Sequence, residues 1–272
     1  MHLNPATALV GVMNSGLAKI GRRQCFLILA ALSGAFLVQG SVHAQALDLR
    51  LEGPPTAEFH FARLMYAGSN LSRRRDSWTT DYPDAEYHLM QGVNRMTRID
   101  GEPVNYSGSG GRLINLADDR VFEYPWLYAV EVGQWYLSES EAGQLREYLD
   151  RGGFLMVDDF WDEYEWDVFA QSMSKVFPDR PIVDLEEDHP LMNVSFDLNQ
   201  DTQIPGRNGQ QFGTSPQWRA IFDDHGRLVV AINFNMDMGD AWEHADDPFY
   251  PEPMTSLAYR FGVNYIIYSM TH

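Results

Sequence analysis

The chain is short of cysteine and of positive charge. Its 272 residues include one cysteine, Cys25, and 38 acidic residues against 20 basic ones, for a formal net charge of −18. Once the N-terminal segment that carries Cys25 is cleaved, disulfides, zinc–thiolate sites and cysteine nucleophiles are excluded together. The negative charge disfavours anionic membrane surfaces and nucleic acid, so no nucleic-acid partner is expected. Cations, basic partners and neutral ligands remain as the classes of ligand or partner that the charge allows.

The chain also lacks a long hydrophobic run. The uncharged, mostly apolar stretch at 25–38 is too short for a comfortable membrane span, and three basic residues precede it. Together with the small-x-small sequence at 44–46, this pattern predicts a secretory signal peptide over residues 1–46 and no stable transmembrane span after its cleavage. An uncleaved N-terminal anchor is the alternative. Residues 47–272 are then expected to form one exported domain, periplasmic or secreted.

Familiar catalytic motifs are missing as well. The sequence contains no Gly-x-Ser-x-Gly turn, and its glycine-rich stretch at 107–111 has neither the lysine of a phosphate-binding loop nor the GxGxxG order. It also contains no Asp-x-Asp-x-Asp-Gly run of the EF-hand type. The sequence therefore points to no standard catalytic class.

Strand and helix patterns alternate through the remaining chain. Strands are expected at 58–66, 112–116, 126–132, 154–157 and 181–185, with a hairpin at 218–222 and 228–233. Helices are expected at 83–97, 138–152, 166–177 and 254–270. Ser138 and Glu141 form a capping box at the start of the second helix. The alternation predicts a three-layer α/β/α domain with a mostly parallel sheet and a late β-hairpin.

The apolar strand at 154–157 ends in two adjacent carboxylates, Asp158 and Asp159. Ligands of open α/β sheets bind outside the carboxyl ends of the strands, which predicts a cleft at this position. An acidic and aromatic stretch follows the strand at 228–233, so the two segments can share one rim. The candidate ligand-binding residues of this rim are Trp78, Asp81, Asp158, Asp159, Trp161, His189, Asp237 and Trp242.

Two explanations are open for the acidic residues. Asp158, Asp159, Asp237 and His244 would supply oxygen and nitrogen ligands to a divalent cation, the one cofactor that the sequence suggests. The alternative is that the acids cap helix starts or solvate surface loops. His189 is held out of helical geometry by the proline after it, and is either a base or ligand or a turn histidine bonded to a neighbouring carboxylate.

Several segments together resemble one known family. They are Phe59 to Tyr66, Tyr124 to Tyr128, Leu145 to Leu149, Gly152-Gly153, Asp158-Asp159, Asp188-His189-Pro190 and Tyr259 to Asn264. In these segments the chain resembles domain-of-unknown-function family 4159. The resemblance implies a fold like that of the class I glutamine amidotransferases, which is flavodoxin-like, and it implies no activity because the family has none assigned.

One departure from the amidotransferases bears on function. Those enzymes place a cysteine nucleophile on a sharp strand-to-helix turn, whereas the corresponding strand end here carries Asp158 and Asp159. We therefore expect an amidotransferase-like domain without the nucleophile, acting as a ligand-binding or interaction module at the cell envelope with a small-molecule or protein partner. The alternative is a metal-dependent hydrolase that uses the two aspartates.

Overall fold

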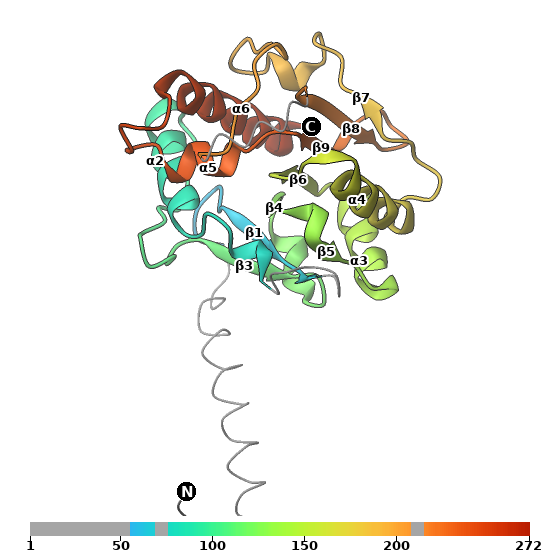
Figure 1. Cartoon of the computed structure of the whole chain (residues 1–272). Coiled ribbons are helices and arrows are strands. Elements are labelled where there is room, and N and C mark those ends of the chain that lie inside the picture. The colour runs from blue at the N-terminus through green and yellow to red at the C-terminus, as the bar shows by residue number, and fades with distance from the viewer. Residues whose placement is uncertain (1–54, 69–75, 208–214) are drawn as a thin grey trace, which may run out of the picture. The chain divides into compact units, whose positions relative to one another are not determined.

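The computed structural model describes residues 55–68, 76–207 and 215–272 (Figure 1). The expected signal peptide, residues 1–46, lies outside these ranges. The strands are β1 (Ala62–Met65), β2 (Ala67–Gly68), β3 (Arg112–Asn115), β4 (Trp126–Val130), β5 (Trp135–Tyr136), β6 (Phe154–Asp158), β7 (Val183–Asp184), β8 (Gln217–Phe222) and β9 (Leu228–Phe234). The α-helices are α2 (Asp84–Met96), α3 (Glu139–Asp150), α4 (Asp162–Val176), α5 (Met238–Glu243) and α6 (Glu252–Thr271). Short 3₁₀ turns occupy Ser77–Thr79, Asp119–Glu123, Val132–Gln134 and Pro190–Met192.

In the described residues, seven strands form one sheet in the order β3-β1-β4-β6-β9-β8-β7. The first five of these strands are parallel, β8 runs antiparallel to β9, and β7 runs antiparallel to β8. The small strands β2 and β5 pair separately. The mostly parallel sheet with a late hairpin is therefore confirmed.

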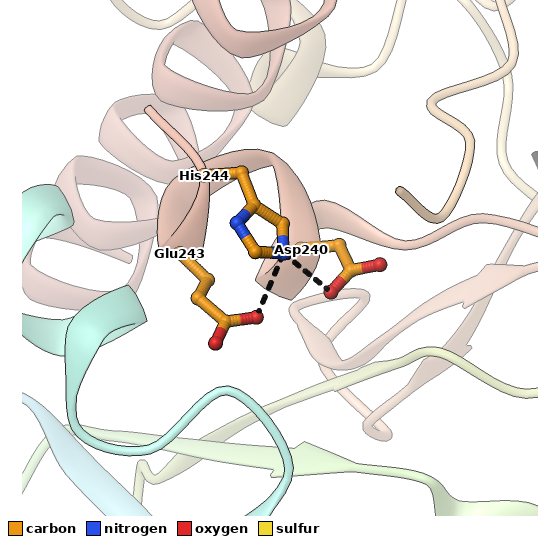
Figure 2. Close-up of side chains that lie close together, drawn as sticks. All are labelled: Asp240, Glu243 and His244. Atoms are coloured by element: carbon orange, nitrogen blue, oxygen red, sulfur yellow. Dashed lines mark ion pairs between the residues drawn. The ribbon is translucent and has the colours of Figure 1, made fainter. Parts of the chain in front are cut away.

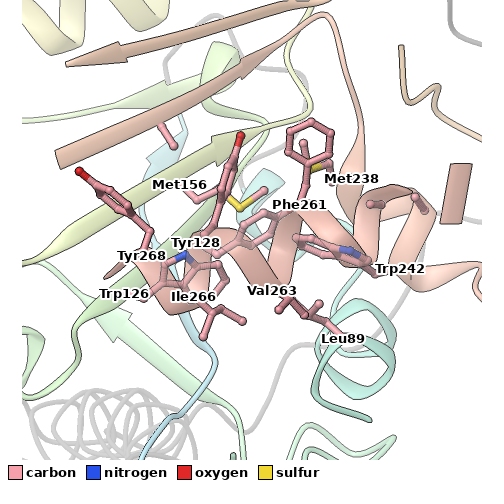
Figure 3. Packing of buried hydrophobic residues seen from close by; sticks show 14 of the residues in the cluster. Leu89, Trp126, Tyr128, Met156, Met238, Trp242, Phe261, Val263, Ile266 and Tyr268 are labelled. Atoms are coloured by element: carbon pink, nitrogen blue, oxygen red, sulfur yellow. The ribbon is translucent and has the colours of Figure 1, made fainter. Parts of the chain in front are cut away.

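Helices cover both faces of the sheet and make three layers. Alternate side chains of a strand point to opposite faces. Trp126 and Tyr128 of β4 pack in the core with α2, α5 and α6, whereas Leu127 and Ala129 pack in the core with α3 and α4. Figure 3 shows the first of these cores, where Tyr128 lies among Met156, Trp242 and Phe261. None of the helices in the described ranges is long and apolar enough to span a membrane.

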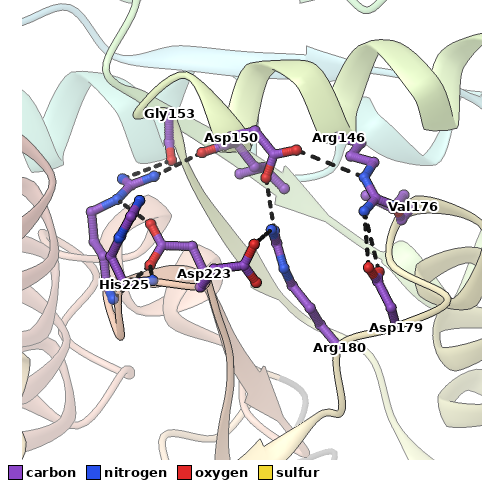
Figure 4. A network of polar contacts seen from close by, with 11 residues as sticks. Arg146, Asp150, Gly153, Val176, Asp179, Arg180, Asp223 and His225 are labelled. Atoms are coloured by element: carbon purple, nitrogen blue, oxygen red, sulfur yellow. Dashed lines mark hydrogen bonds and ion pairs between the residues drawn. The ribbon is translucent and has the colours of Figure 1, made fainter.

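A network of ion pairs and hydrogen bonds lies at the amino end of the sheet (Figure 4). Arg227, at the start of the β9 hairpin arm, pairs with Asp223 and donates to the carbonyl oxygens of Leu149 and Gly152 at 2.7 and 2.9 Å. The guanidinium thus satisfies carbonyls at the C-terminus of α3, which has no basic residue in its last turn. Arg180 pairs with Asp150 at 2.8 Å beside it.

The strands expected at 126–132 and 181–185 are shorter, at Trp126–Val130 and Val183–Asp184, and three other elements also differ from the sequence prediction. The first strand is limited to 62–65, and Phe59 makes only an isolated bridge to Gly101. Helix α4 begins at Asp162, four residues early, because the Asp162 carboxylate accepts from the backbone N–H groups of Tyr164 and Glu165. Helix α5 lies inside the stretch 235–253 that was predicted to be a loop. The carboxylate of Asp158, which is distant in sequence, stabilises its first turn.

Candidate functional site

An unusual backbone conformation marks the carboxyl ends of three neighbouring strands. Glu131, Asp159 and Asn235 directly follow β4, β6 and β9 and have φ values of 54°, 50° and 61°. Asp81 and Asp162 share this left-handed conformation, at 63° and 60°, and complete the set of non-glycine residues with positive φ in the described chain. Such conformations are disfavoured for residues with a Cβ and concentrate at functional sites. Backbone strain therefore lies at the edge where the sequence predicts a site.

Asp158, the last residue of β6, is fully buried. Its Oδ2 accepts hydrogen bonds from the backbone N–H groups of Met238 at 2.6 Å and Gly239 at 3.0 Å, both in the first turn of α5. The Tyr128 hydroxyl of β4 donates to the same oxygen at 3.4 Å. Asp158 Oδ1 has no hydrogen-bond partner among the described residues. One carboxylate therefore ties β4 and β6 to α5 and keeps one oxygen unused.

Asp81 approaches the same point from the segment between β1 and α2. It is 8% exposed, and its Oδ2 also lacks a hydrogen-bond partner within the described ranges. This oxygen faces Gly239 so closely that a Cβ at that position would lie 2.1 Å from it and 2.6 Å from the Tyr128 hydroxyl. Only glycine leaves room for the two oxygen atoms here. Asp81 Oδ2 and the Tyr128 hydroxyl thus converge on the turn of α5 that Asp158 holds.

Arg63 of β1 positions the turn that carries Asp81. Its guanidinium pairs with the Glu86 carboxylate, and both side chains are 1% exposed. It also donates to the carbonyl oxygens of Trp78 and Thr80 at 3.0 and 2.7 Å. All three guanidinium nitrogens are thereby engaged, and the charge of Arg63 is balanced by Glu86. Arg63 therefore attracts the Asp81 carboxylate only through a longer-range charge interaction.

Three carboxylates of the site lie close enough to share a ligand. Asp81, Asp237 and Asp240 each bring one oxygen within 4.8 Å of the others. Asp237 is the N-cap of α5, where its Oδ1 accepts from the backbone N–H of Asp240 at 2.8 Å. Divalent cations bind oxygens at about 2.0–2.6 Å, so the ligands of one ion lie no more than about 5 Å apart. The spacing of these carboxylates matches that limit.

A second group shares Asp240 (Figure 2). The His244 Nε2 atom lies 3.2 Å from Glu243 Oε2 and 3.8 Å from Asp240 Oδ1. All three side chains are half-buried, whereas Asp81 and Asp237 are buried. The imidazole therefore sits on the outer side of the acidic site and pairs with two of its carboxylates.

The electrostatics of the site favour protonation or a bound cation. Burial raises the pKa of Asp158 to about 7, against the opposing effect of its backbone hydrogen bonds. Burial is also the first cause that raises the pKa of Asp81, Asp159 and Asp237 well above the ordinary value, and the neighbouring carboxylates add to it. Like charges held together in a buried site disfavour each other's ionised forms. A positive ion would remove that repulsion.

The structure brings together four of the predicted rim residues, Asp81, Asp158, Asp159 and Asp237. Trp161 joins them as a buried side chain whose Nε1 donates to Asp159 Oδ1 at 2.7 Å. Trp78 is half-buried in the 3₁₀ turn 77–79 and takes part through its carbonyl. Trp242 is a core residue, fully buried with its ring 5.6 Å from that of Tyr128.

The predicted histidines lie apart from Asp158 and Asp159. His189 Nδ1 accepts from the backbone N–H of Leu191 at 3.2 Å, and its ring lies 5.5 Å from those of Phe222 and Tyr268. Phe222 pairs with the first residue of β9, which puts His189 at the opposite end of that strand from Asn235. His244 lies in the second group, where it pairs with Glu243 and Asp240.

Sequence reasoning missed Glu131, Tyr128 and Gly239. Glu131 raises the pKa of Asp159, and it follows β4 as Asp159 follows β6. The strand-end rule would have found Glu131 had the predicted strand stopped at residue 130. Gly239 carried no local signal, because its role depends on atoms of β4 and of the turn before α2.

Comparison with known proteins identifies the family of the chain. No curated protein matches the chain. The family model described as Domain of unknown function (DUF4159) matches residues 60–270 and so contains every residue of the acidic site. This match covers most of the chain. The chain therefore belongs to the DUF4159 family.

Proposed function

We propose that the chain is an exported α/β domain that binds a hard divalent cation at the carboxyl end of its sheet, with Asp81, Asp237 and Asp240 as protein ligands. One observation carries the proposal: Asp81, Asp237 and Asp240 each bring one carboxylate oxygen within 4.8 Å of the others, and the buried Oδ2 of Asp81 has no hydrogen-bond partner in the described residues. An all-oxygen donor set suits Ca²⁺, Mg²⁺ or Mn²⁺ better than a softer metal.

The fold that we infer for the domain is flavodoxin-like, of the class I glutamine amidotransferase kind. The strand order β3-β1-β4-β6-β9 is the 2-1-3-4-5 order of that layout when the five parallel strands are numbered along the chain. In this layout the ligand site lies at the carboxyl ends of the strands next to the switch point, here between β1 and β4. Arg63 of β1 and Tyr128 of β4 border the acidic site on this side.

An amidotransferase needs a thiol nucleophile. The one cysteine of the chain, Cys25, lies within residues 1–46, so the acidic site offers carboxylates and no thiol. We therefore assign the domain to ligand binding at the cell envelope, with residues 1–46 as the export signal. Amino-terminal sequencing of the protein from cell fractions tests the export. A start near residue 47 in the periplasmic or secreted fraction is expected, and an intact amino terminus in the membrane fraction would reject cleavage.

The cation site is tested by thermal unfolding of EDTA-treated protein in Ca²⁺, Mg²⁺, Mn²⁺ and Zn²⁺. An ion present at about 100 times its Kd stabilises the folded state by about 2.7 kcal/mol, a rise in Tm of about 5–10 °C for a domain of this size. Asp237→Asn and Asp81→Asn should each raise the Kd for the ion more than about tenfold. Asp188→Asn, at an exposed position, should leave the Kd unchanged.

The same variants separate a cation site from a merely structural one. Removing one of several buried like charges should raise the Tm of the cation-free protein at neutral pH, even as the response to the ion is lost. Variants that lower Tm in EDTA and keep the full cation response would overturn the proposal. No response of the wild-type protein to any of the four ions would do the same.

A metal-assisted hydrolase is the second candidate, and the unpartnered Oδ1 of Asp158 favours it. A carboxylate whose pKa is about 7 suits a general base at neutral pH. In this role Asp158 would take a proton from a water molecule polarised by the ion. Cation-dependent cleavage of bis-p-nitrophenyl phosphate or p-nitrophenyl acetate that is lost in Asp158→Asn, with cation binding retained, would favour the hydrolase over the binding module.

A further inference from the structure

A cavity of about 450 Å³ lies beside α2, outside the acidic site. We call it the tyrosine groove and define it by Tyr87, Gln91, Arg95, Tyr106, Asp246 and Tyr259. The first three come from α2, Tyr106 from the loop before β3, Asp246 from the segment after α5, and Tyr259 from α6. Its volume falls within the range of small-molecule sites.

One wall of the groove is a pair of tyrosines in close contact. The ring centroids of Tyr87 and Tyr106 are 3.8 Å apart with their planes 31° from parallel. Tyr106 is nevertheless 58% exposed. More than half of the Tyr106 surface is thus open to a ligand beside the groove.

The loop that presents Tyr106 is fixed by its own hydrogen bonds. The Asn105 Oδ1 atom accepts from the backbone N–H groups of Ser107 at 2.9 Å and Ser109 at 3.2 Å, and from the Ser107 hydroxyl at 2.6 Å. Gly108 and Gly110 supply the positive φ values that the turn requires. A platform held in place before binding loses little conformational entropy when a ligand stacks on it.

The floor of the groove depends on a glycine within a helix. A Cβ at Gly92 of α2 would lie 2.4 Å from Cε1 of Tyr259, so the phenol ring can rest against the helix only because residue 92 has no side chain. Glycine is a poor helix former, and its presence in the interior of α2 is explained by this close approach. Met96, 42% exposed, extends the apolar surface beside it.

The polar groups around the groove carry both signs of charge. Arg95 donates to Gln91 Oε1 at 2.9 Å. The His88 Nε2 atom lies 3.8 Å from Asp246 Oδ2, and the buried His88 Nδ1 has no partner among the described residues. A guanidinium in the groove opposes a cationic ligand, and the exposed Asp246 carboxylate opposes an anionic one. A neutral ligand with several hydroxyl groups satisfies both.

We propose that the tyrosine groove binds a neutral saccharide. The C–H face of a sugar ring stacks on tyrosine, while its hydroxyl groups both donate to a carboxylate or amide oxygen and accept from a guanidinium or amide N–H. Asp246, Gln91 and Arg95 offer these groups next to the Tyr87–Tyr106 platform. This assignment uses no residue of the cation site and stands independently of it.

The test uses the purified full-length chain with cellotetraose, maltotetraose and N-acetylchitotetraose as probes, each added at millimolar concentration and followed by saturation-transfer NMR and calorimetry. The informative variant is Tyr106→Ala, since Tyr106 is exposed and its removal spares the core. The matched control is Tyr164→Ala, because Tyr164 is 54% exposed on α4, on the other face of the sheet. Tyr106→Phe, which keeps the ring, should retain binding.

At least one of the three saccharides should bind, with affinity reduced about tenfold in Tyr106→Ala and unchanged in Tyr164→Ala. Failure of all three to bind would overturn the proposal. Binding that is insensitive to Tyr106→Ala would overturn the location. Choline, used as a cationic probe, should not compete, and its binding in place of the saccharides would reject the neutral-ligand assignment.

Discussion

Replacing Asp158 by Asn should change how the stability of the cation-free protein depends on pH. Asp158 is fully buried, and its pKa rises from the ordinary 3.8 to about 7 on folding. The folded state therefore binds this proton more tightly than the unfolded state does. Stability from this group is greatest at low pH and is lost as the pH rises from about 4 through about 7, the reverse of ordinary acid denaturation.

The magnitude follows from that shift. A rise of about 3 in pKa corresponds to about 4 kcal/mol of free energy of unfolding lost over the whole titration, and more than half of that loss falls between pH 5 and pH 8. Asn keeps an oxygen that accepts from Met238 and Gly239, so its packing cost should be similar at both pH values. At each pH, ΔΔG is the free energy of unfolding of Asp158→Asn minus that of the wild type. The difference between the ΔΔG values at pH 5 and pH 8 therefore reports the effect of the Asp158 charge alone.

The assay is urea denaturation followed by circular dichroism, in EDTA, at pH 5 and pH 8, for the wild type and Asp158→Asn. Relative to the wild type, the free energy of unfolding of the variant should rise by about 2–3 kcal/mol from pH 5 to pH 8. Asp158 also raises the pKa of Asp159 and Asp237, so relief of their repulsion would enlarge the gain. Equal ΔΔG values at pH 5 and pH 8 would refute the reasoning that the carboxyl group titrates in the folded protein.

Three further substitutions test the surroundings of the site. Glu86→Ala leaves the buried Arg63 guanidinium without its carboxylate and should cost about 3–5 kcal/mol in urea denaturation; a loss below about 1 kcal/mol would show that the pair is dispensable. Gly239→Ala places a methyl group 2.1 Å from Asp81 Oδ2 and should weaken cation binding in a calorimetric titration, so an unchanged Kd would argue against Asp81 as a ligand. Ser138→Ala removes the capping box of α3 and should lower stability by about 1 kcal/mol without altering the cation response; a changed response would contradict the separation of α3 from the site.

Features encoded by neighbouring residues could be predicted from the sequence. The Ser138–Glu141 capping box forms as expected, with Glu141 Oε2 accepting from the backbone N–H of Ser138 at 2.9 Å. The apolar run after Gly152 and Gly153 forms a fully buried central strand that ends at Asp158. Local hydrogen bonds and hydrophobic periodicity suffice for these elements.

Helix α5 could not be predicted in this way. Its first turn is held by the carboxylate of Asp158, which lies 80 residues from Met238 in sequence. The local pattern of acids and aromatics in this stretch predicts a loop. For the same reason the sequence predicts Trp242 as a residue of the ligand-binding rim. Once the helix forms, Trp242 turns inward against Tyr128. The position of His189 was hidden for a related reason, since a turn motif does not reveal which end of the sheet it faces.

The charged residues at the two ends of the sheet are arranged in opposite ways, and this contrast supports the proposed cation site. At the amino end, Arg227 pairs with Asp223 and Arg180 with Asp150, so each carboxylate has a cation beside it. At the carboxyl end, buried carboxylates gather on strained backbone around α5, where their neighbours raise one another's pKa. The same chain thus shows that it can pair its acids where only stability is needed. The carboxyl end keeps the repulsion and strain that the proposed cation would relieve.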